Sequence, residues 1–278
     1  MSIPTSGTLS ASAINVILGR SSNDTFSLGD PTLTSIAARA DRQMKFVNLY
    51  GKSTTPPSIP GAILEIMMGT SNTPTIDSFN NSFTPSTNPP IMINDSTRGF
   101  VLRTIGGAEP TASNRAWMAT TCNLSLAASY TKATWVYPTV SNQTTNNGHI
   151  ISANRTTKPG TGHFMFCPNG RNVGAGHTTI GSITNNVTDP NELIMNTWTH
   201  FVVTYDNPTT TFTMYRDGSN VATTSNASFA WTGLVSSIGI GSTTSGNAFT
   251  GYLDNVRLYN RVLSSNEVQT LYFNERLL

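Results

Sequence analysis

The chain has 278 residues, of which only 11% are charged, and its formal net charge is +2. The basic residues are scattered, so the sequence lacks the basic run that favours nucleic-acid binding. No stretch approaches the roughly 18–20 consecutive apolar residues that a membrane-spanning helix needs. We therefore expect neither a nucleic-acid partner nor a membrane span.

The first 52 residues carry two short helix patterns. Ser10 can cap a helix that Gly19 ends, and Asp30-Pro31 can open a second one. Helices this short are unstable alone, so we expect residues 1–52 to form an anchoring segment that docks onto another surface. Residues 53–61 are rich in Pro, Ser and Thr, which predicts an extended linker. The N-terminus also lacks a basic start followed by an apolar run, so we expect no signal peptide.

From residue 62 to residue 278 the pattern changes to short strands. Strands are predicted near residues 61–68, 98–104, 116–126, 130–140, 148–154, 162–168, 199–206, 211–218, 236–242 and 251–260. Clusters of Gly, Pro, Asn and Ser separate them, and the longer connection over residues 185–197 has room for a turn of helix. Regular short strands with such turns are typical of an antiparallel sandwich or barrel.

Residues 198–217 hold the clearest strand pair. Alternation places Phe201, Val203 and Tyr205 on one face of the first strand, and Trp198, His200, Val202 and Thr204 on the other. Asp217-Gly218 supplies residues that tolerate the positive φ of a tight turn. We expect both faces of this strand pair to be covered, so its aromatic residues are interpreted as architecture.

Three segments in order resemble laminin G-type domains, members of the concanavalin A-like lectin and glucanase superfamily. They are "SYTKATWVYP" (129–138), "NTWTHFVVTYD…TFTMYRDG" (196–218) and "FTGYLDNVRLYNRVLSSNEVQTLY" (249–272). The resemblance implies an all-β, two-sheet antiparallel jelly-roll sandwich over residues 62–278, with a short helix after the closing strand. It also implies that Trp135, Trp198 and His200 fill positions inside the sandwich.

The N-terminal segment has a second resemblance. "IPTSGTLSASAINVILGRSSNDTFSLGD", followed by "FVNLYGKS", is similar to short segments of phage and large DNA-virus virion proteins. The acidic residue that those segments carry before the helix-ending glycine is missing here. This resemblance implies an anchor that binds other capsid or virion proteins, and a location in the virus particle.

Catalytic motifs are weak in this sequence. Glycoside hydrolysis needs two carboxylates about 5–9 Å apart, and none of the five glutamates has an acidic residue two or four positions away. The four histidines show no metal-ligand spacing, and no G-x-S-x-G motif is present. We therefore expect a protein that is not an enzyme.

Two residues are candidates for binding. Asp254 matches the Asp of the family's closing motif, which implies either a calcium ligand or an acceptor that holds the closing strand through backbone hydrogen bonds. Asn255 replaces the family's following Glu, which removes one calcium ligand. Trp231 lies in a loop-like region and is the candidate for an exposed platform on which a sugar ring could stack. No cofactor is required, and calcium is the one ion considered.

Two cysteines are too few for a disulfide framework. Cys122 and Cys167 are the whole complement of the chain. We expect two buried free thiols in a chain made in a reducing compartment, with their pairing left open.

These observations favour a non-enzymatic virion structural protein, either a minor capsid component or a surface-decorating one. The alternative is a carbohydrate-binding adhesion module that recognises a host glycan, and a glycoside hydrolase comes third. The expected partners are other capsid proteins, with a host glycan in the alternative, and a homo-oligomer is compatible with both.

Overall fold

The computed structural model describes residues 59–66, 79–85, 90–105, 118–120, 124–125, 128–141, 143, 148–155, 162–168, 170–179, 182–225, 235–241 and 249–276. The predicted helices of residues 1–52, most of the predicted linker, Cys122 and Trp231 lie outside these residues. The chain divides into two compact units, Met1–Ile59 with Thr270–Leu278 and Pro60–Gln269. Both sheets described below belong to the second unit.

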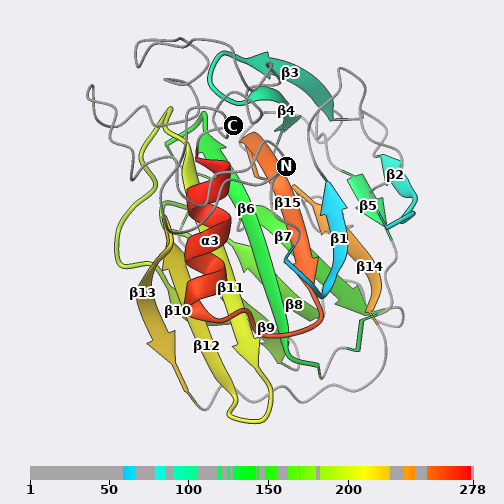
Figure 1. The fold of residues 1–278 in the computed structure, drawn as a ribbon, viewed down its shortest axis with the longest axis vertical. Coiled ribbons are helices and arrows are strands. Elements are labelled where there is room, and N and C mark those ends of the chain that lie inside the picture. Colours follow the sequence, from blue (N-terminus) through cyan, green and yellow to red (C-terminus); the bar gives the residue numbers. More distant parts are fainter. Residues whose placement is uncertain are drawn as a thin grey trace, which may run out of the picture. The chain divides into compact units, whose positions relative to one another are not determined.

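Two antiparallel sheets form this unit, as the sequence predicts (Figure 1). The larger sheet contains, in spatial order, β13 (Ser219–Thr224), β12 (Thr211–Arg216), β11 (Thr199–Asp206), β6 (Tyr130–Pro138), β15 (Gly251–Tyr259), β4 (Gly99–Thr104) and β3 (Ile91–Asp95), with β1 (Ala62–Ile66) also paired to β15. The smaller sheet contains β10 (Ser182–Thr188), β9 (Gly174–Thr179), β8 (Gly162–Phe166), β7 (His149–Arg155), β14 (Val235–Ile240), β5 (Met118–Thr120) and β2 (Phe83–Pro85). The two-sheet jelly-roll prediction is confirmed.

The hydrophobic core lies between the two sheets. Alternate residues of the larger sheet, such as Phe201, Val203 and Leu253, belong to one buried cluster with Met165 and Ile240 of the smaller sheet. The predicted alternation of residues 198–206 is therefore confirmed, because the Phe201 face of β11 is the core face. The turn between β12 and β13 has positive φ at Asp217 and Gly218, also as predicted.

A polar cluster is buried within this core. The Lys132 Nζ donates hydrogen bonds to the carbonyl oxygens of Ile151 and His163, at 3.1 and 2.7 Å, and so links the two sheets. The Tyr130 ring stacks on His163 with centroids 3.9 Å apart, and its hydroxyl lies 3.4 Å from the His177 Nε2. These polar side chains are enclosed by aromatic rings, so their protonation is linked to the stability of the fold.

The opposite face of the larger sheet is also covered, and it carries large polar and aromatic side chains. Trp135 is 4% exposed, His200 1% and Asp254 3%. Trp135 pairs across the strands with both His200 and Asp254, on the face away from Val136 and the core. The prediction that Trp135 and His200 lie inside the sandwich is wrong in this respect: both are buried, but on the outer face of the larger sheet. Strand alternation separates the two faces, whereas burial alone does not.

The closing strand leads into helix α3 (Ser265–Glu275), which confirms the predicted C-terminal helix. Ser264 and Glu267 form a capping box: the Ser264 N–H donates to the Glu267 Oε2 at 2.8 Å, and the Glu267 N–H donates to the Ser264 Oγ at 3.3 Å. Arg261 binds the Glu267 carboxylate with two nitrogens, at 2.7 and 3.1 Å. No helix in the described ranges is long and apolar enough to cross a membrane.

The sequence analysis did not predict some of the strands. β9, β10 and β13 are rich in Gly, Thr, Ser and Asn and lack the apolar run that predicts a strand. β2 and β3 are short and flank prolines, which argue against a strand. The connection over residues 185–197 has room for a turn of helix but does not form one, because β10 continues to Thr188 and irregular backbone follows it. Pairing with β9 overrides the low strand propensity of "SITNNVT".

Candidate functional site

One row of side chains crosses the outer face of the larger sheet. Tyr137 of β6 pairs with Tyr252 of β15, Tyr252 pairs with Arg103 of β4, and Arg103 pairs with Ile91 of β3. Trp198, the residue before β11, lies on the other side of Tyr137. Directly opposed residues share a face of a sheet, so Tyr137, Tyr252, Arg103 and Ile91 form a single line across four strands, and the Trp198 ring extends this line beside Tyr137.

The three aromatic residues of this row, Trp198, Tyr137 and Tyr252, are called here the aromatic strip. The Trp198 and Tyr137 rings have centroids 5.2 Å apart, and the Tyr137 and Tyr252 rings are stacked at 5.3 Å with an interplanar angle of 25°. All three side chains are half-buried, whereas Arg103 and Ile91 at the end of the row are exposed. The rings therefore support one another and still reach the surface of the unit.

Two backbone features place the strip. Asn196 adopts a positive φ of 54°, and its N–H donates to the Pro138 carbonyl oxygen at 3.0 Å, which ties the start of β11 to the end of β6. Gly251 has a φ of 155°, and a Cβ at this position would lie 2.2 Å from the Tyr137 carbonyl oxygen. Glycine is required there because only a residue without a side chain lets β15 approach β6 beside Tyr137.

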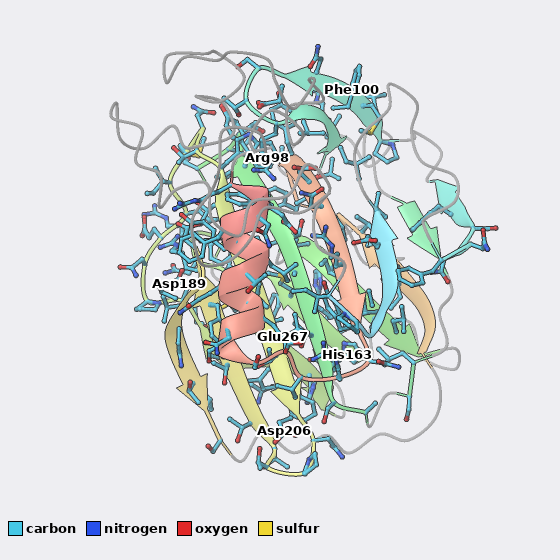
Figure 2. The ribbon with its side chains drawn as sticks, in the orientation of Figure 1. Arg98, Phe100, His163, Asp189, Asp206 and Glu267 are labelled. Carbon is cyan, nitrogen blue, oxygen red and sulfur yellow. The ribbon has the colours of Figure 1, made fainter. Side chains whose placement is uncertain are left out.

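A buried ion pair supports the strip from the neighbouring row. The Arg98 Nε lies 2.6 Å from the Asp254 Oδ2. The Arg98 guanidinium carbon also lies 4.0 Å from the centroid of Trp135 and 5.4 Å from that of Trp198, so this cation contacts both rows. Figure 2 shows Arg98 beside the end of β6 and the start of β15. Arg98 thus connects the closing strand to the ring at one end of the strip.

A bulge in β15 places two charged residues on the outer face. The pairing of β15 with β6 shifts between Asp254 and Arg257, and Asn255 has a φ of 48° within this step. Strict alternation would put Asp254 and Arg257 on opposite faces, whereas the extra residue puts both on the outer one. Arg257 then pairs with Glu65 of β1 at 2.6 Å.

A neutral histidine lies among the ion pairs of the buried outer face. Burial, together with the nearby Arg257 and Arg98 cations, lowers the pKa of His200 to about 3. Burial raises the pKa of the Asp254 carboxyl, and the Arg98 cation opposes that shift. His200 is therefore neutral at physiological pH, and its role is to pack against Trp135, with ring centroids 5.1 Å apart.

The strip has polar groups that are available to a ligand. The Tyr137 and Tyr252 hydroxyls make no hydrogen bond to the residues that the structure describes, and Arg103 pairs with no carboxylate in the same ranges. Half-buried rings that carry unengaged hydroxyls beside a free cation can bind a ligand that is apolar on one side and rich in oxygen on the other.

The structure tests only some of the site residues that the sequence predicts. Asp254 accepts hydrogen bonds from Arg98 and from the Asn255 N–H at 2.8 Å, which is the strand-holding arrangement. No cluster of three or more His, Cys, Asp or Glu suited to a metal occurs among the described residues, and calcium binding by Asp254 stays a prediction. Trp231 lies outside the described ranges and also stays a prediction. Cys167 is a buried free thiol, and burial raises its pKa.

Sequence reasoning missed Tyr137, Tyr252 and Arg103, and it assigned Trp198 to the core, although this residue is half-buried. Alternation does place Tyr137 on the Trp135 face of β6 and Tyr252 on the Asp254 face of β15. The missing information was the register between strands that are more than 100 residues apart in the chain, as Tyr137 and Tyr252 are.

Comparison with a family model identifies the larger group of proteins. A model described as the concanavalin A-like lectin/glucanases superfamily matches residues 112–269, more than half of the chain. The match includes the aromatic strip and Asp254, whereas Arg98 and Arg103 precede it. No curated protein sequence matches the chain.

Solved structures share the fold at low sequence identity. Domain 4 of a GH43 extracellular arabinanase from Geobacillus stearothermophilus, in complex with arabinotriose, has a TM-score of 0.58 and 17% identity, and the match covers 76% of this chain and 98% of that one. The binding domain of Paraclostridial Mosquitocidal Protein 1 has a TM-score of 0.58 and 14% identity, with 76% and 52% covered. A botulinum neurotoxin type C structure, from work on cell entry through two ganglioside molecules, has a TM-score of 0.56 and 13% identity, with 76% and 50% covered. The chain therefore spans about half the length of the two toxin structures.

Proposed function

Because the chain belongs to the concanavalin A-like lectin/glucanases superfamily, we propose that it is a non-enzymatic carbohydrate-binding module that holds a glycan on the aromatic strip. The observation that carries the proposal is the continuous, half-buried line of Trp198, Tyr137 and Tyr252 with unengaged phenol hydroxyls. Sugars present C–H groups that pack on aromatic rings and hydroxyls that exchange hydrogen bonds with phenols.

The fold relatives support a binding role. One was solved in complex with arabinotriose, and two others are a toxin binding domain and a neurotoxin whose cell entry depends on interaction with two ganglioside molecules. At 13–17% identity the likeness itself shows the fold alone, so the binding role is part of the proposal, and the choice of the strip as the binding surface rests on its geometry in this chain.

Two carboxylates of the outer face support the non-enzymatic part of the proposal. Asp254 is paired with Arg98, and Glu65 is paired with Arg257. A glycosidase needs one carboxyl that can protonate the leaving oxygen and another that can attack or activate water. Carboxylates held by arginine at 2.6 Å are anchored as structural counter-ions rather than presented to a substrate.

The virion role is a separate prediction. It rests on the resemblance of residues 1–52, which lie outside the described residues, and the relatives reported above include no virion protein. Mass spectrometry of purified particles from the source would test it directly. A carbohydrate-binding module can be carried on a particle, so the two roles are compatible.

The binding proposal is tested on the full chain with a glycan array, followed by calorimetric titration of the glycans that bind. We expect Trp198→Ala and Tyr252→Ala each to weaken binding at least tenfold, about 1.4 kcal/mol. Phe273→Ala is the matched control, because it removes an exposed aromatic ring from α3 and should leave affinity unchanged. Tyr252→Phe, which removes only the hydroxyl, keeps the test informative if the alanine variants unfold. Wild-type affinity in correctly folded strip variants would refute the proposed surface.

A further inference from the structure

We propose that the glycan held on the aromatic strip is anionic, and that Arg103 binds its carboxylate or sulfate group. This inference rests on the proposed function, since it names the class of sugar for the same site. Arg103 directly opposes Tyr252 on the outer face of the larger sheet, at the end of the strip. A sugar that lies over the Tyr252 ring would therefore present a substituent to the guanidinium.

Arg103 differs from the other arginines around it in its partners. Five other arginines of the described chain pair with carboxylates: Arg98 with Asp254, Arg171 with Glu192, Arg216 with Asp189, Arg257 with Glu65 and Arg261 with Glu267. Arg276 instead lies over the rings of Tyr272 and Phe273. Arg103 forms no such pair with the described residues. The planar guanidinium fork suits the two oxygens of a carboxylate or sulfate, and no carboxylate among the described residues occupies it here.

The two strand partners of Arg103, Ile91 and Tyr252, carry no carboxylate that could pair with the guanidinium. Ile91, its partner on β3, is 49% exposed and offers no acceptor. The nearest acidic residue along β15 is Asp254, which is buried and engaged by Arg98. Binding energy at the strip is therefore divided between ring contacts, which any sugar can make, and one charge contact that only an anionic sugar can make.

Three predictions about affinity follow from this division. An acidic sugar should bind more tightly than its neutral counterpart by about tenfold, a typical effect of one charge-assisted hydrogen-bonded pair. Added salt should weaken binding of the acidic sugar and leave that of the neutral sugar unchanged, because exposed charges are screened. Replacement of Arg103 should remove the difference between the two sugars and preserve binding to the neutral one.

The experiment titrates the full chain with trigalacturonate, its methyl ester, a sulfated oligosaccharide and neutral arabinotriose. The methyl ester matches trigalacturonate in shape and lacks the charge, and the sulfated probe separates sulfate from carboxylate recognition. The variants are Arg103→Gln and Arg103→Lys, with Arg171→Gln as the control, since Arg171 is also an exposed arginine but lies outside the strip. Thermal melting of each variant establishes that it is folded.

A preference of the wild-type chain for trigalacturonate or the sulfated probe, lost in Arg103→Gln and kept in Arg171→Gln, supports the inference. Partial loss in Arg103→Lys would show that the fork geometry matters as well as the charge. Equal binding of the acid and its ester, or an unchanged preference in Arg103→Gln, overturns the inference and leaves the proposed function standing. Failure of the wild-type chain to bind any sugar, here or on the array, overturns both.

Discussion

Arg98 and Asp254 lie 156 residues apart in the chain and form a buried ion pair, with the Arg98 Nε and the Asp254 Oδ2 2.6 Å apart. This pair joins the hairpin of β3 and β4 to the closing strand β15, and it places a cation 4.0 Å from the centroid of Trp135. A buried charge that loses its partner is costly because water cannot replace that partner. Among the contacts in this part of the fold, we therefore expect loss of the Arg98–Asp254 pair to lower the stability most.

We predict that Asp254→Asn lowers the free energy of unfolding by about 3–5 kcal/mol, since it leaves Arg98 buried without a counter-charge. Urea denaturation at neutral pH measures the effect. Glu192→Gln is the control, because the Arg171–Glu192 pair is exposed and its loss should cost less than about 1 kcal/mol. Similar small losses in both variants would contradict a structural role for the buried pair.

Calcium should have no effect on stability if Asp254 holds the closing strand. Its Oδ1 accepts from the Asn255 N–H and its Oδ2 from Arg98, so both carboxylate oxygens are engaged. We expect the same melting temperature in calcium and in a chelator. A rise in melting temperature with calcium that disappears in Asp254→Asn would establish the metal-ligand role instead.

The buried histidines should make the fold sensitive to acid. Burial and, to a lesser extent, the nearby Lys132 cation lower the pKa of His177 and His149 to about 3 and that of His163 well below its usual range. In the unfolded chain these groups titrate near 6.5, so between about pH 6.5 and 3 the unfolded chain binds protons that the folded chain excludes. Stability should therefore fall as the pH falls through this window.

His163→Phe tests this linkage, because neither ring nitrogen of His163 has a hydrogen-bond partner among the described residues. The phenyl ring can keep the stack on Tyr130, so stability at pH 7.5 should be equal or higher. Below pH 6 the variant should lose stability less steeply than the wild-type chain, by about 1.4 kcal/mol per pH unit for the one proton removed. Urea denaturation between pH 7.5 and 4 measures both quantities, and parallel curves would contradict the assignment.

The capping box predicts a modest effect at the start of α3. Glu267→Gln removes the charge that binds Arg261 and weakens the acceptor for the Ser264 N–H, and we expect a loss of about 1 kcal/mol. The hydrogen bonds from Arg261 lower the pKa of Glu267 to about 2. This contribution should therefore be present above pH 4.5 and vanish as the pH falls toward 2. Thermal melts of the wild-type chain and the variant should therefore differ less at pH 3 than at pH 7.

Tryptophan fluorescence can locate a bound sugar. Trp198 is half-buried at one end of the aromatic strip, whereas Trp135 is buried beneath Arg98. We expect the fluorescence change on addition of a bound glycan to vanish in Trp198→Phe and to survive in Trp135→Phe. An undiminished change in Trp198→Phe would place the sugar elsewhere, and Trp231→Phe would then test the platform that the sequence predicts.

Local sequence patterns were sufficient for the fold class and for several elements. Alternation over residues 199–216 places Phe201 and Val203 in the core, and Asp217-Gly218 forms the turn with positive φ. The helix α3 is implied instead by the resemblance of residues 249–272 to the closing motif of laminin G-type domains. The alternation and the turn depend on backbone geometry and side-chain period over a few residues, so the local sequence is enough to predict them.

The aromatic strip and its supports required the tertiary structure. Tyr137 meets Tyr252 because β15 returns beside β6, and Arg103 joins them only through the register of β4 against β15. Asp254 and Arg257 share the outer face because of a bulge at Asn255 that alternation does not anticipate. Strand register is selected by the packing of the whole sheet. No single segment of the sequence therefore predicts the row of side chains that we propose to bind a sugar.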